Sequence, residues 1–198
     1  MNVTVAVVYH SGYGHTAKQA EAVAQGAGSV AGSKSLLIKV EDIDKNWAAL
    51  ESVDAIIFGA PTYMGSASAP FKAFMDASSK VWMEGKWANK LAAGFTNSAS
   101  RSGDKLSTLF QLSVFAAQHS MIWVSLGLMP GHNKSDTTEE TLNRHGFFLG
   151  AGAQSNADQG ADVAPSAFDL KTAEHLGARV AKVAQDLARG RAASAKGV

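Results

Sequence analysis

Nearly continuous apolar runs recur along the chain, and each is followed by a loop and then by apolar residues at helical spacing. The first run, Val3 to Tyr9, is rich in β-branched residues, which is typical of a parallel strand covered on both faces. Further runs lie at residues 35–40, 55–60, 91–96 and 121–126. Strands that alternate with helices in this way predict an α/β fold with a doubly wound, five-stranded parallel sheet and helices on both faces.

Four of the intervening stretches carry apolar residues at the spacing of amphipathic helices. Pro70 suits the first turn of the second stretch, because the amide hydrogen that proline lacks is unpaired there in any helix. We expect the apolar stripes to face the core. Their members are Ala17, Ala20, Ala24 and Ala27; Phe71, Phe74 and Met75; Leu106, Leu109, Phe110, Val114 and Ala117; and Leu170, Ala173, Leu176, Val180, Val183 and Leu187.

The number and order of these elements fit one domain. A chain of 198 residues that is 46% hydrophobic can build one substantial core. We predict a single domain at residues 1–190, an insertion around 127–146 and a flexible tail at 191–198. Within the polar insertion, Asp136 to Glu140 predicts a short capped helix, and Phe147 to Leu149 is expected to resume the fifth strand.

Composition excludes several kinds of chemistry. The chain has no Cys, which rules out disulfides, thiolate metal sites and thiol nucleophiles. Its histidines show no metal-ligand spacing, so no metal site is predicted. The 18 Lys and Arg are scattered and nearly balanced by 17 Asp and Glu, which argues against nucleic acid as a partner. No apolar run approaches the ~20 residues of a membrane span, and we predict a cytoplasmic protein with no membrane span.

The loop after the first strand is suited to hold a phosphate. It places two glycines and two hydroxyl groups at the start of a helix, where free backbone amides and the helix dipole favour an anion. The loop lacks the lysine of a P-loop, and Ala17 stands where a dinucleotide-binding fingerprint has its third glycine. A plain glycine turn with Thr16 as a helix cap is the alternative. The residues are Ser11, Gly12, Tyr13, Gly14, His15 and Thr16.

The loops after the third and fourth strands should meet this phosphate loop, because ligands of doubly wound sheets bind beyond the carboxyl ends of the strands. The earlier loop is polar and aromatic, as suits a flat ring: Pro61, Thr62, Tyr63, Met64 and Gly65. The later loop offers small side chains, free amides and one cation: Thr96, Asn97, Ser98, Ala99, Ser100, Arg101 and Ser102. Each loop taken singly is equally a connector, but three at one sheet edge favour a cofactor site.

These motifs resemble those of a known family. Together with Lys90-Leu91-Ala92 and His119-Ser120-Met121, the first two loops are similar in order and spacing to the flavodoxin-like NAD(P)H:quinone oxidoreductases of the WrbA type. The resemblance covers most of the first 126 residues. It implies a flavodoxin-like fold with strand order 2-1-3-4-5, FMN as cofactor, NADH or NADPH as electron donor and a quinone-like acceptor. It also implies a homodimer or homotetramer.

The same resemblance implies roles for individual residues. The loop from Ser11 to Thr16 would bind the FMN phosphate, with Tyr13 near the nicotinamide nucleotide, and the two later loops would contact the flavin. His119 would lie near the flavin edge, and Trp82 would stack on the quinone. For His119 the alternative is a favourable position at a helix C-terminus in any protein. For Trp82 the alternative is a place in the core.

Three functions therefore compete. The leading hypothesis is an FMN-dependent oxidoreductase that takes electrons from NAD(P)H and passes them to a quinone or similar acceptor. The alternative is a flavodoxin-type carrier of single electrons, although such carriers are typically strongly acidic and this chain has a net charge of +1. The third is a non-catalytic protein that keeps the fold, with or without FMN, because fold alone does not determine function.

Overall fold

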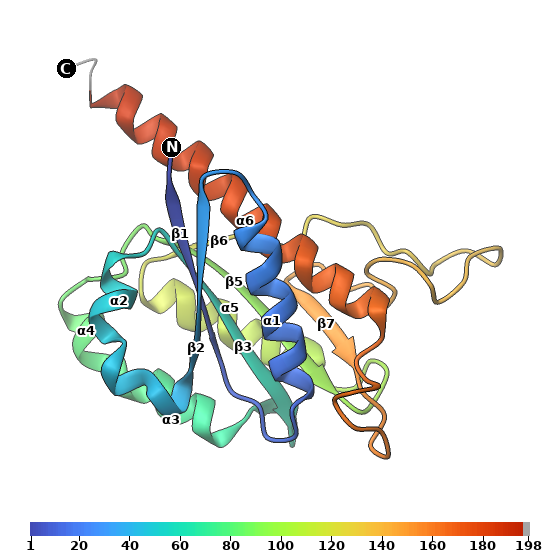
Figure 1. The fold of residues 1–198 in the computed structure, drawn as a ribbon. Helices are drawn as coiled ribbons and strands as arrows, with labels where there is room; N and C mark the ends of the chain where they lie inside the picture. Colours follow the sequence, from blue (N-terminus) through green and yellow to red (C-terminus); the bar gives the residue numbers. More distant parts are fainter. Residues whose placement is uncertain (196–198) are drawn as a thin grey trace.

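The computed structural model describes residues 1–195, which form an α/β structure with one parallel sheet between two layers of helices (Figure 1). The structure confirms the predicted alternation of strands and helices. In chain order the elements are β1 (Val3–Tyr9), α1 (His15–Gly28), β2 (Ser33–Lys39), a 3-10 helix η1 (Val40–Lys45), α2 (Trp47–Ser52), β3 (Ala55–Tyr63), β4 (Ser66–Ala67), α3 (Ala69–Ala77), α4 (Ser79–Met83), β5 (Leu91–Ser98), α5 (Lys105–Gln118), β6 (Ile122–Trp123), β7 (Ala151–Gln154) and α6 (Ala167–Ser194).

The strands lie in the order β2-β1-β3-β5-β6, with β7 paired to β5 and β4 paired to β3. All pairings are parallel except that of the short strand β4 with β3. The predicted order 2-1-3-4-5 is therefore confirmed for the parallel strands, because the fourth predicted strand is β5. Two details differ: β4 is an additional strand, and the fifth position is occupied by two short strands, β6 and β7, which both pair with β5.

The fifth strand is interrupted, and its prediction needs two corrections. The expected strand at 121–126 is reduced to β6, beside Leu91 and Ala92 of β5. Strand pairing resumes at Ala151, opposite Phe95, rather than at the predicted Phe147 to Leu149. Phe147 packs as a side chain against the new strand instead, because a Cβ added at Gly152 would lie 2.4 Å from its ring. The apolar character of Phe147 therefore reflects packing on the sheet and not membership of it.

The loop expected after the third strand is a hairpin. Strand β3 continues beyond residue 60 to Tyr63, and the chain returns as β4 with Tyr63 opposite Ser66. The two residues between them, Met64 and Gly65, have φ values of 48° and 83°, the left-handed conformations of a two-residue hairpin turn that matches strand twist. The hairpin extends from the carboxyl end of β3, so its tip lies beside the loops that follow β1 and β5.

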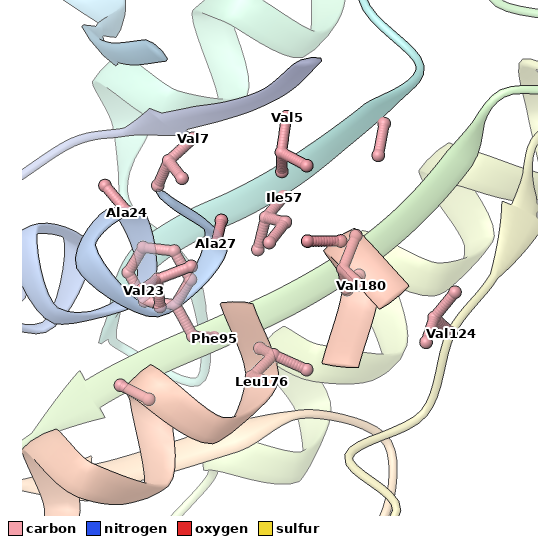
Figure 2. Packing of buried hydrophobic residues seen from close by; sticks show 14 of the residues in the cluster. Val5, Val7, Val23, Ala24, Ala27, Ile57, Phe95, Val124, Leu176 and Val180 are labelled. Atoms are coloured by element: carbon pink, nitrogen blue, oxygen red, sulfur yellow. The ribbon is translucent and has the colours of Figure 1, made fainter. Parts of the chain in front are cut away.

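One face of the sheet is covered by α1 and α6, which lie in front of it in Figure 1. Figure 2 shows this cluster, with side chains of the sheet packed against those of both helices. The labelled members include Val5, Val7, Ile57 and Phe95 of the sheet, Val23, Ala24 and Ala27 of α1, and Leu176 and Val180 of α6. The predicted apolar stripes of α1 and α6 thus face the core as expected.

The opposite face is covered by the helices between β2 and β6 and is rich in aromatic side chains. Phe58 of β3 contacts Phe71, Phe74, Trp87 and Phe115, which come from α3, the turn before β5, and α5. Burial of several such rings supplies much of the stabilising apolar area of a small domain. Because alternate residues of the central strands face the two layers, each buried strand is apolar along its whole length.

The prediction for α5 is partly wrong. Leu109 is buried as expected, but Leu106, Phe110 and Val114 point away from the core, and Phe110 is 60% exposed. The buried face also carries Lys105 and Thr108, polar residues that an apolar pattern assigns to the outside. The three exposed residues lie four apart and so form one apolar row on the outer face of α5.

The insertion extends from the body of the molecule, to the right in Figure 1. Residues 127–146 contain no helix or strand, so the capped helix predicted from Asp136 to Glu140 is wrong. The hydroxyl of Thr137 instead donates to the carbonyl of Lys134 at 2.8 Å, which closes a local turn. Side chains of Ser, Thr and Asp commonly compete with helix formation in this way.

The last helix reaches further than expected. It ends at Ser194, so the tail predicted at 191–198 begins inside α6, and residues 196–198 lie outside the described part of the chain. Arg191 donates to the backbone oxygen of Asn89 at 2.7 Å, which fixes this end of α6 to the turn before β5. Across residues 1–195, each helix is too short or too polar to cross a membrane.

Close contact between α1 and α6 requires glycine. A Cβ added at Gly177 of α6 would lie 1.9 Å from the carbonyl oxygen of Val23 in α1, and one at Gly26 would lie 1.9 Å from that of Glu174. We expect Gly177→Ala to lower the free energy of unfolding by about 2–3 kcal/mol, because the helices must separate. Urea unfolding measures this change.

Gly190 supplies a matched control in the same helix, since a Cβ there meets nothing within 4 Å. Gly190→Ala should instead raise the free energy of unfolding by roughly 0.5–1 kcal/mol through higher helix propensity. Equal effects of the two substitutions would contradict the close-packing interpretation.

Candidate functional site

A cavity of about 1110 Å³ opens at the carboxyl edge of the sheet, where β1, β3, β5 and β7 end. It slightly exceeds the roughly 300–1,000 Å³ that is usual for small-molecule sites. The three predicted loops all contribute to it, through Tyr13, His15 and Thr16; Pro61, Thr62, Tyr63, Met64 and Gly65; and Asn97, Ser98, Ala99 and Ser100. The other predicted cofactor-binding residues lie in the same loops but do not line the cavity: Ser11, Gly12, Gly14, Thr96, Arg101 and Ser102.

The first loop is held tightly by its own serine. The Ser11 hydroxyl accepts from the amides of Gly14 and Ala17, both at 3.1 Å. Gly14 has a φ of 90°, and a Cβ there would lie 2.9 Å from the Cβ of Ala161. The first turn of α1, within residues 15–28, carries no acidic side chain, and the neutral Ser11 hydroxyl occupies the amide of Ala17 in that turn. The positive end of the helix dipole therefore faces the cavity unneutralised, as an anion site requires.

The hairpin supplies an aromatic wall over a layer of hydroxyl groups. The Tyr63 ring lies edge-on to that of Tyr13, with 6.2 Å between centroids. Burial, followed by the nearby Tyr13, raises the pKa of the Tyr63 phenol, which is therefore neutral at physiological pH. Below the ring, the Thr62 hydroxyl donates to Thr108 Oγ1 at 2.8 Å and lies 2.7 Å from Thr96 Oγ1. This layer fixes the hairpin to β5 and α5.

A buried lysine shapes the third loop. Lys105 is 0% exposed, and its ammonium group donates to Ser98 Oγ at 2.7 Å and to the backbone oxygens of Ser100 and Arg101. Burial lowers the pKa of Lys105 to about 8, while Asp169 raises it and Arg144 lowers it further. The amine is still mostly charged at neutral pH, so it holds the loop by charge-assisted hydrogen bonds. Sequence reasoning missed Lys105, whose only signal is its position at the start of the helix after a polar loop.

A fourth loop, after β7, completes the cavity and was also missed. Ser155, Asn156, Ala157, Gln159 and Gly160 line it, and the Ser155 hydroxyl donates to Asn97 Oδ1 at 3.0 Å. His15 Nε2 lies 2.8 Å from the backbone oxygen of Gln159, which ties this loop to the first one. The apolar residues Phe147 to Leu149 predict the resumed strand too early in the chain. The sequence therefore gives no indication that the loop at 155–160 directly follows a strand, β7.

A buried carboxylate anchors the last part of the site. Asp169 accepts from Arg144 Nε at 2.7 Å, from Arg144 Nη2 at 2.8 Å and from the amide of Gln154 at 2.9 Å, and His145 lies beside it. Burial raises the pKa of Asp169, but the hydrogen bonds from Arg144, His145 and Gln154 outweigh it and lower the pKa to about 2. The carboxylate thus joins α6, β7 and the end of the insertion.

The two residues assigned catalytic roles, His119 and Trp82, do not reach this cavity. His119 is the C-terminal cap of α5, and the adjacent Ser120 accepts from the amide of Asn89 just before β5 begins. Helix α5 runs back from the cavity, so His119 lies at the opposite edge of the sheet. It packs against Trp87 and bonds to Ser78 at 2.9 Å, and burial lowers its pKa to about 4. Trp82 lies on α4, half exposed and also outside the cavity.

These positions correct both interpretations. His119 is a neutral, buried structural residue, so the proton transfer expected of it near neutral pH has no support in the geometry. Trp82 is neither core nor cavity wall within this chain. Among residues 1–195, no three His, Asp or Glu side chains gather as metal ligands would.

Comparison with known proteins gives consistent results. The model of the NADPH-dependent FMN reductase family matches residues 10–133. The chain is 43% identical over 185 residues to the flavodoxin FldP of Pseudomonas aeruginosa, covering 91% of this chain and 96% of that protein. It is 32% identical over 208 residues to an NAD(P)H dehydrogenase (quinone) of Geotalea uraniireducens, covering 93% and 99%.

A solved structure agrees. The crystal structure of a WrbA-like flavodoxin from Agrobacterium tumefaciens is 45% identical, with a TM-score of 0.73, covering 93% of this chain and 99% of that one. The likeness extends through the insertion and α6, beyond the first 126 residues to which the sequence resemblance was confined.

The Asp169 cluster predicts a specific loss of stability in acid. Its pKa is about 2 when folded against 3.8 for the free side chain, so the cluster stabilises the fold fully above pH 4 and ceases to do so as the pH falls through 2. The contribution is about 2 kcal/mol. Urea unfolding at pH 5 and at pH 2 measures this loss. The decrease in the free energy of unfolding between these pH values should be about 2 kcal/mol smaller in Asp169→Asn than in the unaltered protein.

Asp76 is the control, because its carboxylate is exposed and pairs only with Lys72 at the surface. Asp76→Asn should leave the slope with pH unchanged. If the stability of Asp169→Asn depends on pH as steeply as that of the unaltered protein, the acid-sensitive stability does not come from this cluster.

Proposed function

Because the chain belongs to the NADPH-dependent FMN reductase family, we propose that it is an FMN-dependent oxidoreductase that transfers electrons from NADH or NADPH to a quinone or similar acceptor. The observation that carries the proposal is one cavity in which the N-terminus of α1, an aromatic hairpin and an amide-rich loop meet. Relatives bearing the name NAD(P)H dehydrogenase (quinone), at 30–33% identity, support the electron donor and the acceptor.

The residues present fit FMN. The loop from Ser11 to Thr16 offers an anion site. A side chain at Gly14 would collide with Ala161, so the backbone of the loop, and not a side chain, would contact a phosphate. The hairpin and the third loop form two walls at a spacing fixed by the hydroxyl layer of Thr62, Thr96 and Thr108. A flat ring between these walls would contact Tyr63 and Met64 on one side and residues 97–100 on the other.

When bound, FMN would supply the hydride and electron chemistry, and this chain's residues would bind, orient and shield it. Ser11 would keep the first loop in shape through its bonds to Gly14 and Ala17. Lys105 would hold the third loop in place from below. The fully exposed Met64 and the exposed Tyr13 mark the open side of the cavity, where donor and acceptor would enter in turn.

The partners follow from this function. The acceptor would be a small quinone-like molecule, and the protein would work in the cytoplasm, where NADH and NADPH are available. A homodimer or homotetramer is part of the proposal, supported by the exposed apolar row of Leu106, Phe110 and Val114 on α5, since exposed rows of this kind commonly pack against another chain.

One observation favours a second candidate. The 43% identical relative bears the name flavodoxin, which supports a carrier of single electrons. Against it stands the net charge of +1, because docking of a flavodoxin on basic partners needs an acidic surface. A non-catalytic FMN-binding protein would share the cavity but not the turnover.

Two measurements separate these functions. Titration of the purified protein into FMN should quench flavin fluorescence and leave a yellow protein; unchanged fluorescence would overturn both flavin functions. Steady-state oxidation of NADH and NADPH with benzoquinone then distinguishes enzyme from carrier, because a carrier bound to FMN would show no sustained turnover. We expect turnover with ping-pong kinetics, since donor and acceptor share the open side.

Gly14→Ala tests the phosphate loop. The substitution adds a Cβ at a φ of 90°, 2.9 Å from Ala161, so the loop must open and its amides must move. We expect the dissociation constant for FMN to rise about tenfold or more, which corresponds to ~1.4 kcal/mol. Fluorescence titration provides the measurement, with circular dichroism to verify folding.

Gly85→Ala is the matched control. Gly85 also has a positive φ, of 62°, but its Cβ would meet nothing within 4 Å and it lies outside the cavity. Gly85→Ala should lower the free energy of unfolding through left-handed backbone strain and leave the dissociation constant for FMN unchanged. If both variants bind FMN as tightly as the unaltered protein, this loop does not hold the phosphate.

A further inference from the structure

A second cavity lies beside the first and has no role in the proposed function. Its volume is about 490 Å³, and Asn156 and Gln159 line both cavities. Its other polar walls include Arg101, Arg144 and Glu139. Arg101 ends the third loop of the main site, so the second cavity continues from the wall at which a flat ring would rest.

Two arginines in this cavity hold one carboxylate between them. Arg101 Nη1 donates to Glu139 Oε1, and Arg144 Nη1 donates to Glu139 Oε2 at 2.9 Å. Each oxygen of the carboxylate is therefore bound by a different guanidinium group. Guanidinium N–H groups also bind phosphate oxygens through charge-assisted hydrogen bonds, so the pair forms an anion site that Glu139 fills.

The Arg144 side chain is held in place by the body of the protein, whereas Arg101, whose side chain is 49% exposed, is held through its backbone. The Arg144 side chain is only 10% exposed, and the two bonds from its Nε and Nη2 to Asp169 leave Nη1 directed at Glu139. The backbone oxygen of Arg101 accepts from the buried Lys105 at 3.4 Å, which supports the loop that carries it.

Glu139 is held far less firmly. Its side chain is 48% exposed, and it belongs to the insertion, which has no helix or strand. Ion pairs at such exposure contribute little to stability because water and salt screen them. A competing anion would therefore displace Glu139 without disturbing either the sheet or α6.

Charge balance favours that exchange. Arg101 and Arg144 are neutralised by Glu139 and Asp169 in the structure. Removal of the Glu139 carboxylate leaves one net positive charge, with the ammonium group of Lys105 close enough to Arg144 for each charge to affect the other. A phosphate group carries more charge and more acceptor oxygens than a carboxylate, and so would bind this pair more strongly than Glu139 does.

We propose that Arg101 and Arg144 form a subsite for a phosphate group of the NAD(P)H donor, and that Glu139 occupies this subsite until the dinucleotide displaces it. The proposal rests on the proposed function, which supplies the donor. The phosphate is either the 2′-phosphate of NADPH or the pyrophosphate common to NADPH and NADH. In the first case Glu139 and Arg101 select NADPH; in the second they set the affinity for both donors.

Binding of 2′,5′-ADP to the FMN-loaded protein, measured by isothermal titration calorimetry, tests the subsite without turnover. Arg101→Gln should weaken binding about tenfold, because one positive charge and its charge-assisted hydrogen bond are lost. Glu139→Gln should tighten it about threefold or more, since the competing carboxylate is removed. The exposed pair of Asp186 and Arg189 on α6 provides matched controls: Asp186→Asn and Arg189→Gln should change nothing.

Steady-state kinetics identifies the phosphate. If Arg101→Gln raises the KM for NADPH about tenfold and leaves that for NADH unchanged, the subsite takes the 2′-phosphate; equal rises indicate the pyrophosphate. The proposal is overturned if 2′,5′-ADP binding responds no more to Arg101→Gln than to Arg189→Gln, or if Glu139→Gln fails to tighten it.

Failure of the proposed function gives a different result. An unaltered protein that binds FMN but oxidises neither dinucleotide would refute the oxidoreductase, while the calorimetric comparison of the four variants would still decide the phosphate subsite. Conversely, normal turnover with unchanged 2′,5′-ADP binding in all four variants would refute the subsite and leave the oxidoreductase standing.

Discussion

Parallel pairing of β1, β3 and β5 is the constraint on which the rest of the structure depends. Residues of these strands pair in register from Val5 with Ala55 to Pro61 with Asn97, and all three strands end at one edge. Connections between parallel strands must cross the sheet as helices, so the loops at that edge are the places where helices begin. The phosphate loop, the hairpin and the third loop are therefore brought together by the backbone hydrogen bonds of the strands, whatever side chains the loops carry.

Buried charges then fix the loops that the strands bring together. Lys105 bonds to three groups of the third loop, and Asp169 joins α6, the insertion and β7. A buried charge is costly unless it is fully hydrogen-bonded, so each of these residues stabilises one loop conformation and disfavours others. Such groups give the cavity a defined shape in a region that has no regular secondary structure of its own.

Local patterns predicted most of the fold because they report which residues must be buried. The continuous apolar run at 3–9 and the stripe of α6 from Leu170 to Val183 were interpretable without knowledge of their partners. Cavity-lining residues were predictable only where the position follows from the residue's own loop, as with Thr16 or Thr62. Lys105, Asp169 and the loop at 155–160 depend on partners that are distant in sequence, and His119 was misplaced because the direction of α5 sends its last turn away from the cavity.

The space available beside the main cavity bears on the choice between enzyme and carrier. A carrier of single electrons needs one exposed edge of its flavin, whereas an oxidoreductase must also hold the far end of a dinucleotide whose nicotinamide lies on the ring. The second cavity, with two arginines around the exposed carboxylate of Glu139, would supply such a hold under the proposal. The buried Asp169 stabilises the fold and also directs Nη1 of Arg144 at the second cavity. An oxidoreductase would use that orientation to hold the dinucleotide, whereas a carrier of single electrons would not.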